Sequence, residues 1–275
     1  MTYRRISVTP VAGALGAEVG GADLREIDEQ TFEEIHRAWL EHQVLFFRDQ
    51  DLLPEHHKAF ASRFGPLQIH PYLVSRKDEG HPEVVVFESD ESRPYVASGW
   101  HTDVTFLEKT PSASVLRGIE VPAFGGDTLF ASMYAAYEAL SDPMKRVLSD
   151  LQAVHDTSRT FSRPAYPSLG KASSEKPPSA LHPVVRTHPE TGRRGLFVNS
   201  AFTHKIKGMH AKESQALLGF LYEHLAQPEF TCRLRWQKNT LAIWDNRCVQ
   251  HRAVADNLKT LRRMERVTVE GERPA

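Results

Sequence analysis

Short apolar stretches separated by turn residues constrain the fold of this chain more than any other feature. In the clearest of them, Phe230, Cys232, Leu234 and Trp236 alternate with polar residues. Alternation with a period of two is typical of a strand that buries one face, and it makes Cys232 a small core residue. Similar short runs occur at residues 6–12, 44–47, 83–87, 112–119, 129–130, 184–186, 196–199, 241–244 and 267–269. We therefore expect a mainly β chain.

Helical spacing is found in only a few segments. Thr31 and Glu34 have the spacing of a capping box, and the apolar residues after them predict a helix to about His42. Pro54 suits the first turn of a second helix, and further helices are expected from Ser141 and Ala211. Because helices and strands do not alternate regularly, we expect a double-sheet barrel of jelly-roll type with helices packed outside.

Length and charge narrow the class of protein. The chain has 275 residues, and we expect one domain over residues 1–275. Its 34 Lys and Arg residues against 35 Asp and Glu residues give a formal net charge of −1. A nucleic-acid-binding protein normally has a basic excess, so we expect no nucleic acid as a partner. No apolar run reaches the length of a membrane span, so no membrane partner is expected either.

The N-terminus and the cysteines indicate a cellular location. Residues 1–5 are followed by no apolar segment, so a signal peptide is not expected. The two cysteines, Cys232 and Cys248, are too few for a disulfide framework. A reducing, cytoplasmic location fits these features.

Residues 162–180 differ in composition from the rest of the chain. Pro164, Pro167, Pro177 and Pro178 lie there among Ser, Lys and Gly. This composition predicts a mobile insertion. A loop of this length in a compact domain is usually functional or disordered, and the sequence fits a lid and a loop without function equally well.

Chemistry is suggested first by the stretch Trp100-His101-Thr102-Asp103. In an extended segment, His101 and Asp103 point the same way. One imidazole and one carboxylate aimed at one spot supply two of the three ligands of a facial metal site. Taken alone, the pair is more often found in a surface turn.

Three residues near the C-terminus extend this pattern. His251 follows the predicted strand 241–244 and adds a second imidazole, although a lone histidine is more often structural. Arg262 and Arg266 face the same way on an extended segment, and each guanidinium can hold an oxyanion through two hydrogen bonds. Two histidines and one carboxylate leave coordination positions open, which suits non-haem Fe(II) better than structural zinc.

With these residues in place, the chain resembles the taurine dioxygenase family of Fe(II)/2-oxoglutarate-dependent dioxygenases over nearly its whole length. The resemblance is carried by Trp100-His101-Thr102-Asp103-Val104-Thr105-Phe106, Gly125-Gly126-Asp127-Thr128-Leu129, His182 to Pro189, and Trp244-Asp245-Asn246-Arg247 through His251. It implies a double-stranded β-helix, a cupin-like jelly roll, in agreement with the strand pattern.

The resemblance also implies roles for individual residues. His101, Asp103 and His251 match the iron ligands, Thr128 and Arg262 match the residues that hold the distal carboxylate of 2-oxoglutarate, and Arg266 matches the arginine that grips the substrate sulfonate. Other substrate positions are matched by His70, Val104, Phe161 and Phe202, with Thr160 beside them. Without the resemblance, His70 would be read as a loop histidine, and Phe161 and Phe202 as core residues.

The implied activity is oxidation of the carbon bearing sulfur in an alkyl sulfonate such as taurine, with Fe(II), 2-oxoglutarate and dioxygen. The products are succinate, CO₂, an aldehyde and sulfite. The expected partner is a small organosulfur anion, and we expect a homo-oligomer, either a dimer or a tetramer.

Two positions depart from the pattern of the taurine enzymes. This chain has Leu73 where they carry Tyr, with Tyr72 one residue earlier, and Ala97 where they carry Asn. Both family residues lie around the amino end of taurine, so the anion end of the site is kept and the amine end is altered. A different sulfonate or an alkyl sulfate ester then becomes the alternative substrate.

Other functions use the same residues. An aryloxyalkanoate dioxygenase would bind a carboxylate at Arg266. A zinc hydrolase needs only the three metal ligands and leaves Thr128 and Arg262 without a purpose. A non-catalytic jelly-roll binding protein would turn nothing over.

Overall fold

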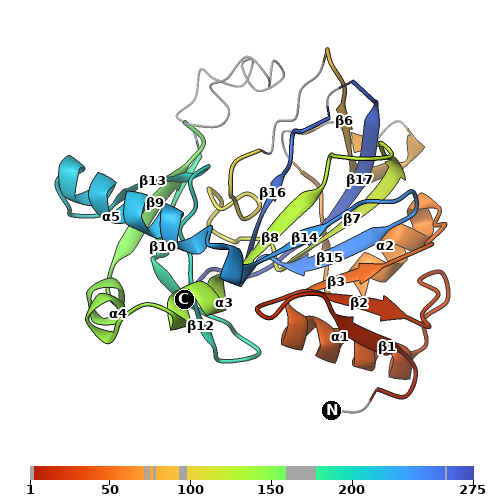
Figure 1. Ribbon diagram of the computed structural model, residues 1–275, viewed down its shortest axis with the longest axis horizontal. Coiled ribbons are helices and arrows are strands. Elements are labelled where there is room, and N and C mark those ends of the chain that lie inside the picture. Colours follow the sequence, from red (N-terminus) through yellow and green to blue (C-terminus); the bar gives the residue numbers. More distant parts are fainter. Residues whose placement is uncertain are drawn as a thin grey trace.

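The computed structural model of the chain describes residues 3–70, 73, 75–76, 79–92, 98–158, 178–257 and 259–275. Within these residues, strands form the centre of the molecule and helices lie around them (Figure 1). The expected mainly β fold with flanking helices is therefore confirmed.

The larger sheet joins strands that are far apart in sequence. Among the described residues its order is β1-β2-β3-β15-β7-β17-β6-β5, and β4 also pairs with β17. All neighbours are antiparallel except β2 and β3, which are parallel. The strands are β1 Ser7–Pro10, β2 Ala17–Gly20, β3 Val44–Phe47, β4 Leu67–Gln68, β5 Ser75–Arg76, β6 His81–Ser89, β7 Ala113–Glu120, β15 Leu241–Asp245 and β17 Arg262–Val269.

A smaller sheet, in the order β14-β8-β16, forms the other layer. Its strands are β14 Thr231–Leu234, β8 Thr128–Ser132 and β16 Val249–Ala253. Buried side chains from both sheets make one core cluster, in which Phe46 and Trp244 of the larger sheet meet Phe130 and Leu234 of the smaller one. Cys232 is buried in the same cluster, as predicted. Two largely antiparallel layers around a shared core are the architecture of a jelly roll.

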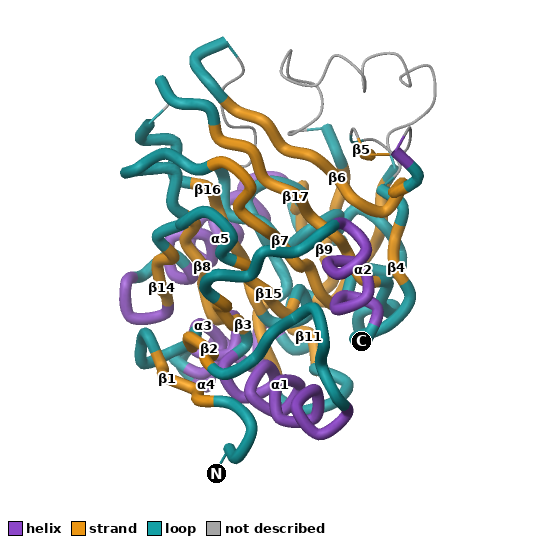
Figure 2. Tube along the Cα trace, turned by 90° about the vertical axis from the view of Figure 1, so that its right-hand side faces the viewer, coloured by secondary structure: helices purple, strands orange, loops and turns teal. Residues whose placement is uncertain are grey.

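Two helices pack against part of the outer face of the larger sheet (Figure 2). They are α1 Glu29–His42 and α2 Pro54–Ser62. Trp39 and Phe60 of these helices share a core cluster with Phe47 and Ile243 of the sheet. The Phe47 and Phe60 rings lie edge to face, with centroids 5.8 Å apart. This part of the sheet is thus buried on both faces, which explains why all four residues of β3 are buried.

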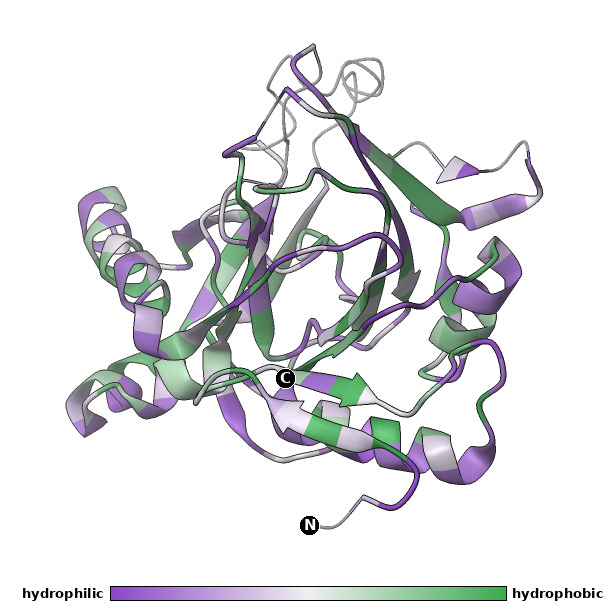
Figure 3. Cartoon of the chain, turned by 45° about the vertical axis from the view of Figure 1, so that its right-hand side comes forward, coloured by the Kyte–Doolittle hydropathy of each residue, from purple (hydrophilic) through white to green (hydrophobic). Residues whose placement is uncertain are grey.

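The remaining elements pack beside the smaller sheet around a separate core cluster that includes Met133, Leu148 and Leu221. The helices among these elements carry both hydrophilic and hydrophobic residues (Figure 3). The elements are α3 Met133–Glu138, α4 Asp142–Leu148, α5 Ala211–Leu225, a 3₁₀ turn Pro228–Phe230, β9 Gln152–Asp156, β10 Ser179–Pro183, β11 Val185–Thr187, β12 Arg194–Leu196 and β13 Thr203–Ile206. No helix in the described ranges combines the length and the apolar character that crossing a membrane would require.

Several expectations need correction. Helix α1 begins before Thr31, because the Asp28 side chain accepts the hydrogen bond from the Thr31 amide and is the N-cap. Glu34, the other half of the expected capping box, instead accepts hydrogen bonds from the Arg4 and Arg5 amides. The predicted insertion at 162–180 lies outside the described residues up to 177, and its last two residues already belong to β10.

The core around β3 gives a stability prediction. Phe47→Ala removes a ring that is 0% exposed, so we expect the free energy of unfolding to fall by about 3–5 kcal/mol in urea denaturation. Phe124→Ala is the matched control, because that ring is 71% exposed and its loss should cost about 0.5 kcal/mol or less. Equal losses from the two variants would contradict the assigned core.

Candidate active site

Backbone pairing brings His101 and His251 together. The His101 amide donates to the His251 carbonyl at 3.0 Å, and the His251 amide donates to the His101 carbonyl at 2.8 Å. This isolated antiparallel bridge attaches the segment around His101 to β16. The two imidazole centroids lie 4.2 Å apart as a result.

Asp103 completes a cluster with these histidines, but not by strand alternation. The chain turns at Asp103, so the expectation of an extended segment through this residue is wrong. Ligand atoms of His101, Asp103 and His251 nevertheless lie within 4.8 Å of one another, and all three residues are buried. The convergence comes from the bridge to β16 together with the turn that follows.

The protonation states of the cluster suit a cation. Burial lowers the pKa of both histidines, that of His251 well below its ordinary value, so the rings are neutral at pH 7. Burial alone raises the pKa of Asp103, but the Arg266 charge, the neighbouring histidines and the hydrogen bond from Ser114 together outweigh burial and bring this pKa below its usual range. The cluster therefore offers two imidazole lone pairs and an ionised carboxylate.

The donor set fits Fe(II). Nδ1 of His101 lies 2.8 Å from the Gly99 carbonyl, which can only accept, so Nδ1 carries the proton and Nε2 carries the lone pair. Two neutral histidines and one carboxylate match the three-ligand set of non-haem iron sites, which leaves positions for other ligands.

Arg266 and His70 lie beside this cluster. Nη1 of Arg266 is 2.5 Å from Oδ1 of Asp103, and its guanidinium lies over the Phe87 ring. Burial, reinforced by the Arg266 charge, lowers the pKa of His70 to about 3. Because the Leu73 amide donates to Nδ1 of the neutral His70 ring, the ring proton is on Nε2, which is then a hydrogen-bond donor.

Thr128 and Arg262 meet around Trp236, which the sequence did not single out for a role. The Trp236 indole donates to the Thr128 hydroxyl at 2.9 Å, so that hydroxyl can donate its own proton to another group. The guanidinium of Arg262 lies over the same indole ring at 6.0 Å and donates to the Gly126 carbonyl. Both predicted 2-oxoglutarate residues are buried.

Val104 and Phe202 form a small apolar cluster with Phe106 next to His101. The ring centroids of His101 and Phe202 are 6.3 Å apart. Val104 has φ of 42°, an unusual value for a β-branched residue. The segment after it is fixed in place, because the Thr105 hydroxyl bonds to His155 and Asn199. The predicted positions Thr160 and Phe161 lie outside the described residues.

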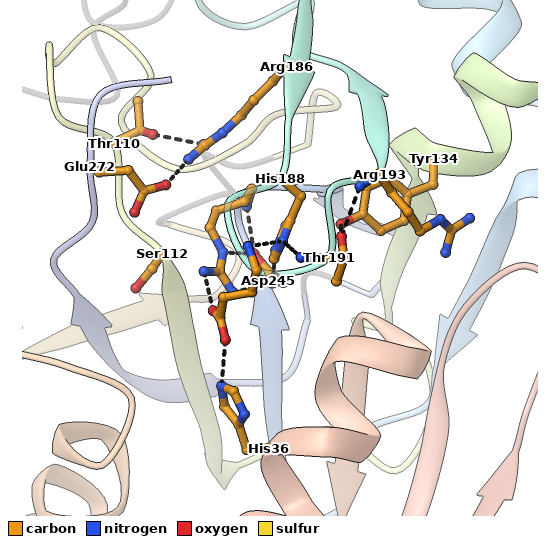
Figure 4. A network of polar contacts seen from close by, with 12 residues as sticks. His36, Thr110, Ser112, Tyr134, Arg186, His188, Thr191, Arg193, Asp245 and Glu272 are labelled. Atoms are coloured by element: carbon orange, nitrogen blue, oxygen red, sulfur yellow. Dashed lines mark hydrogen bonds and ion pairs between the residues drawn. The ribbon is translucent and has the colours of Figure 1, made fainter. Parts of the chain in front are cut away.

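A second buried cluster, made of His188, Asp245 and Cys248, has a similar set of donor types. Figure 4 shows that Asp245 is already paired, with His188 on one side and a guanidinium on the other. That guanidinium belongs to Arg247, which contacts both carboxylate oxygens at 2.8 and 2.7 Å. Burial raises the pKa of the Cys248 thiol well above its ordinary value, so the thiol stays protonated. Arg247 thus provides the positive charge beside Asp245 that a metal ion would otherwise provide, and this cluster is structural.

This second cluster connects the turn between β15 and β16 to the rest of the molecule. Glu190 accepts from Arg247 at 2.5 Å and lies 3.1 Å from His36 of α1. His188 and Glu190 both belong to the connection between β11 and β12. The network therefore anchors the turn from which β16 carries His251 into the candidate site.

The buried histidines predict a pH dependence of stability for the metal-free protein. Burial lowers the pKa of His57 to about 4 and those of His70 and His155 to about 3, whereas unfolded histidines titrate near 6.5. Between these values the unfolded chain binds protons that the folded chain does not, so the free energy of unfolding should fall as the pH falls below about 6.5.

Urea denaturation in EDTA at pH 7.5, 6 and 5 measures this effect. Each such histidine contributes a slope of up to about 1.4 kcal/mol per pH unit. His57→Gln, which lies outside the candidate site, should remove roughly one histidine's share of the slope. A free energy of unfolding that stays constant from pH 7.5 to 5 would show that these imidazoles are not neutral in the folded protein.

Comparisons with known proteins agree with this geometry. The family model described as "Taurine catabolism dioxygenase TauD, TfdA family" matches residues 7–268. An alpha-ketoglutarate-dependent sulfate ester dioxygenase of Pseudomonas putida is 37% identical over 98% of this chain and 91% of the relative. An alkylsulfatase of Acinetobacter baylyi is 36% identical over 98% of this chain and 86% of the relative.

Solved structures give the same result. A taurine dioxygenase of Burkholderia xenovorans superimposes with a TM-score of 0.85 at 36% identity, covering 99% of this chain and 93% of that one. The chain therefore belongs to the TauD/TfdA family and is an Fe(II)- and 2-oxoglutarate-dependent dioxygenase.

Proposed function

We propose that this dioxygenase oxidises an alkyl sulfate ester, with an alkyl sulfonate as the second candidate. The observation that carries the proposal is the pair of buried arginines on β17: Arg262 lies over Trp236, which donates to Thr128, and Arg266 lies beside Asp103. A site with two separate guanidinium groups suits two different anions, the oxoacid and the substrate.

In this proposal His101, Asp103 and His251 hold the iron. The bound metal supplies the activation of dioxygen, coupled to decarboxylation of 2-oxoglutarate. The three side chains are buried, the two histidines are fixed by backbone pairing, and Asp103 is held by Ser114 and Arg266, so together they present an unchanging face to the metal.

Thr128 and Arg262 orient the distal carboxylate of 2-oxoglutarate. The Trp236 indole already donates to the Thr128 hydroxyl, which leaves the hydroxyl proton for a carboxylate oxygen. The Arg262 guanidinium supplies the charge and further donors. Fixing the far end of the cosubstrate limits its rotation and so orients its reacting end.

Arg266, His70 and the Val104 amide bind the sulfur oxyanion. In the metal-free protein the negative charge of Asp103 compensates the positive charge of Arg266. Once Asp103 is a metal ligand, a substrate anion supplies the negative charge beside Arg266. His70 adds a neutral N–H donor, because its Nδ1 accepts from the Leu73 amide. Phe202, packed near His101, offers an apolar surface to the carbon chain.

The preference for a sulfate ester over taurine rests on Leu73 and Ala97. Leu73 lies next to His70 and carries no polar group for an ammonium, and Ala97, which lies outside the described residues, carries none either. Relatives described as an alkylsulfatase and a sulfate ester dioxygenase support the same direction. Hydroxylation of the carbon next to the ester oxygen gives a product that falls apart to an aldehyde and hydrogen sulfate, while 2-oxoglutarate and dioxygen yield succinate and CO₂.

The alternatives rank below this proposal. An aryloxyalkanoate would place a carboxylate at Arg266, and a carboxylate offers that arginine fewer oxygens than a sulfate does. The zinc hydrolase and the non-catalytic binding protein are set aside by the family to which the chain belongs.

Three broader features complete the proposal. The chain forms one domain over residues 1–275, and it assembles as a dimer or tetramer. A cytoplasmic location is supported by Cys232 and Cys248, which are both buried and free.

A substrate panel tests the proposed activity. Succinate formation with Fe(II), 2-oxoglutarate and dioxygen should be supported by hexyl sulfate and, less well, by hexanesulfonate. We expect kcat/KM for hexyl sulfate to exceed that for taurine at least tenfold, because the amine end of the site lacks polar groups. Preferred turnover of taurine or of phenoxyacetate would overturn the substrate assignment.

Substitution of Arg262 and substitution of Arg266 should each raise a different Michaelis constant. Arg262→Gln should raise KM for 2-oxoglutarate roughly 10- to 100-fold, and Arg266→Gln should raise KM for hexyl sulfate by a similar factor, since each loses a charged hydrogen bond. Arg263→Gln is the control on the same strand, because Arg263 is half-exposed and faces Glu88. If both constants rise equally in both variants, the division of the site between the arginines is wrong.

A further inference from the structure

We propose that Trp244, Asn246 and Ser114 form a hydrogen-bonded positioning array that fixes the Asp103 carboxylate for metal binding. The proposal rests on the proposed role of Asp103 as a metal ligand. It assigns a purpose to residues of the Trp244-Asp245-Asn246-Arg247 motif that no step of the proposed reaction uses.

The array is a continuous chain of three hydrogen bonds. The Trp244 indole nitrogen is 3.0 Å from Oδ1 of Asn246, and Nδ2 of Asn246 is 3.0 Å from the Ser114 hydroxyl. The Ser114 hydroxyl in turn is 2.7 Å from Oδ2 of Asp103. Trp244 and Ser114 are direct neighbours on the antiparallel strands β15 and β7, so the sheet itself sets the spacing.

The direction of every bond in the array is fixed by chemistry. An indole nitrogen can only donate, which makes the Asn246 oxygen the acceptor and turns its amide nitrogen toward Ser114. The Ser114 oxygen therefore accepts from Asn246, and its own proton is free to point at Asp103. An ionised carboxylate can only accept, so no alternative arrangement of protons satisfies the array equally well.

The two carboxylate oxygens of Asp103 have different partners. Oδ2 of Asp103 is bound by Ser114, whereas Oδ1 faces the guanidinium of Arg266. Trp244, Asn246 and Ser114 are at most 1% exposed, so water does not compete for these bonds. The carboxylate is thereby held in one rotamer, which is the property that a metal ligand needs.

Trp244 also bears on a second ligand. Its ring lies against His251 with centroids 4.5 Å apart, and Phe130 stacks near the same imidazole at 6.2 Å. Nδ1 of His251 is buried and has no hydrogen-bond partner among the described residues, unlike Nδ1 of His101. Packing against Trp244, rather than a hydrogen bond, therefore orients this ring.

A metal-binding measurement separates positioning from mere stabilisation. Apoprotein is titrated with Mn(II), which substitutes for Fe(II) without oxidation, in a calorimeter. Ser114→Ala should weaken Mn(II) binding about 10- to 100-fold, the usual effect of losing a partner of a metal ligand. Ser114→Thr, which keeps a hydroxyl at this position, should bind Mn(II) with an affinity within about threefold of that of the unsubstituted protein.

Ser112→Ala is the matched control. Ser112 is also buried beside β7, but its hydroxyl donates to the Glu270 carbonyl and not to a metal ligand. We expect both alanine variants to lower the thermal midpoint of the apoprotein to a similar extent, and only Ser114→Ala to change Mn(II) affinity. Trp244→Phe, which keeps a ring beside His251 but removes the N–H, should weaken Mn(II) binding at least threefold.

The outcomes distinguish this inference from the proposed function. If Ser114→Ala and Trp244→Phe both bind Mn(II) as tightly as the unsubstituted protein, the array is only structural and the inference is wrong. Should Ser114→Ala fail to fold, Trp244→Phe against Ser112→Ala decides the question alone. If the unsubstituted protein itself binds neither Mn(II) nor Fe(II), it is the proposed metal site that fails.

Discussion

The buried negative charge of Asp103 is the constraint on which the site depends. A carboxylate that is 3% exposed costs several kcal/mol of desolvation unless charges and donors compensate it. Here the compensation comes from Arg266 of β17 and Ser114 of β7, which are adjacent strands of the larger sheet. Both histidines beside it remain neutral, because burial disfavours their charged form more strongly than the Asp103 charge favours it. The cluster is therefore left ready for a cation.

The larger sheet brings these groups together through strands that are remote in sequence. β7, β15 and β17 contribute Ser114, Trp244 and the two arginines, and their register is set by backbone pairing. The smaller sheet supplies Thr128 on β8 and His251 on β16, which are themselves paired strands. In this jelly roll His251 lies on a strand and His101 is bridged to that strand, whereas Asp103 lies in a turn. The hydroxyl of Ser114 compensates for that weaker backbone support.

The sequence predicted most of the fold because buried strands are visible as apolar runs. It predicted β17 only at 267–269, although the strand begins at Arg262, because four of its first five residues are charged. Their burial depends on partners such as Asp103, which no local pattern reveals. Strands β2, β9, β13 and β16 were also missed, because they are short and their apolar residues face cores built from other segments.

The candidate site could be predicted in its residue types and only partly in its geometry. His101, Asp103 and His251 do lie together, yet the alternation argument for His101 and Asp103 failed because Asp103 already belongs to a turn. Ser114 could not be found from sequence, since a serine in an apolar strand gives no signal until its cross-strand neighbour is known. Asn246 and Trp244 were visible as motif residues, but their hydrogen bonds required the structure.

The charges assigned to the site bear on the nature of the substrate. The metal dication and the 2-oxoglutarate dianion cancel, and Asp103 cancels one of the two buried arginines. In the proposed complex one positive charge is then left over among buried residues, and a sulfate monoester or a simple sulfonate would neutralise it. Zwitterionic taurine carries no net charge, so it would bind there only if polar groups around its ammonium supplied the missing negative potential. The side chains of Leu73 and Ala97 carry no polar group, so the charge balance of the proposed site is consistent with the proposed substrate, a monoanion with an apolar chain.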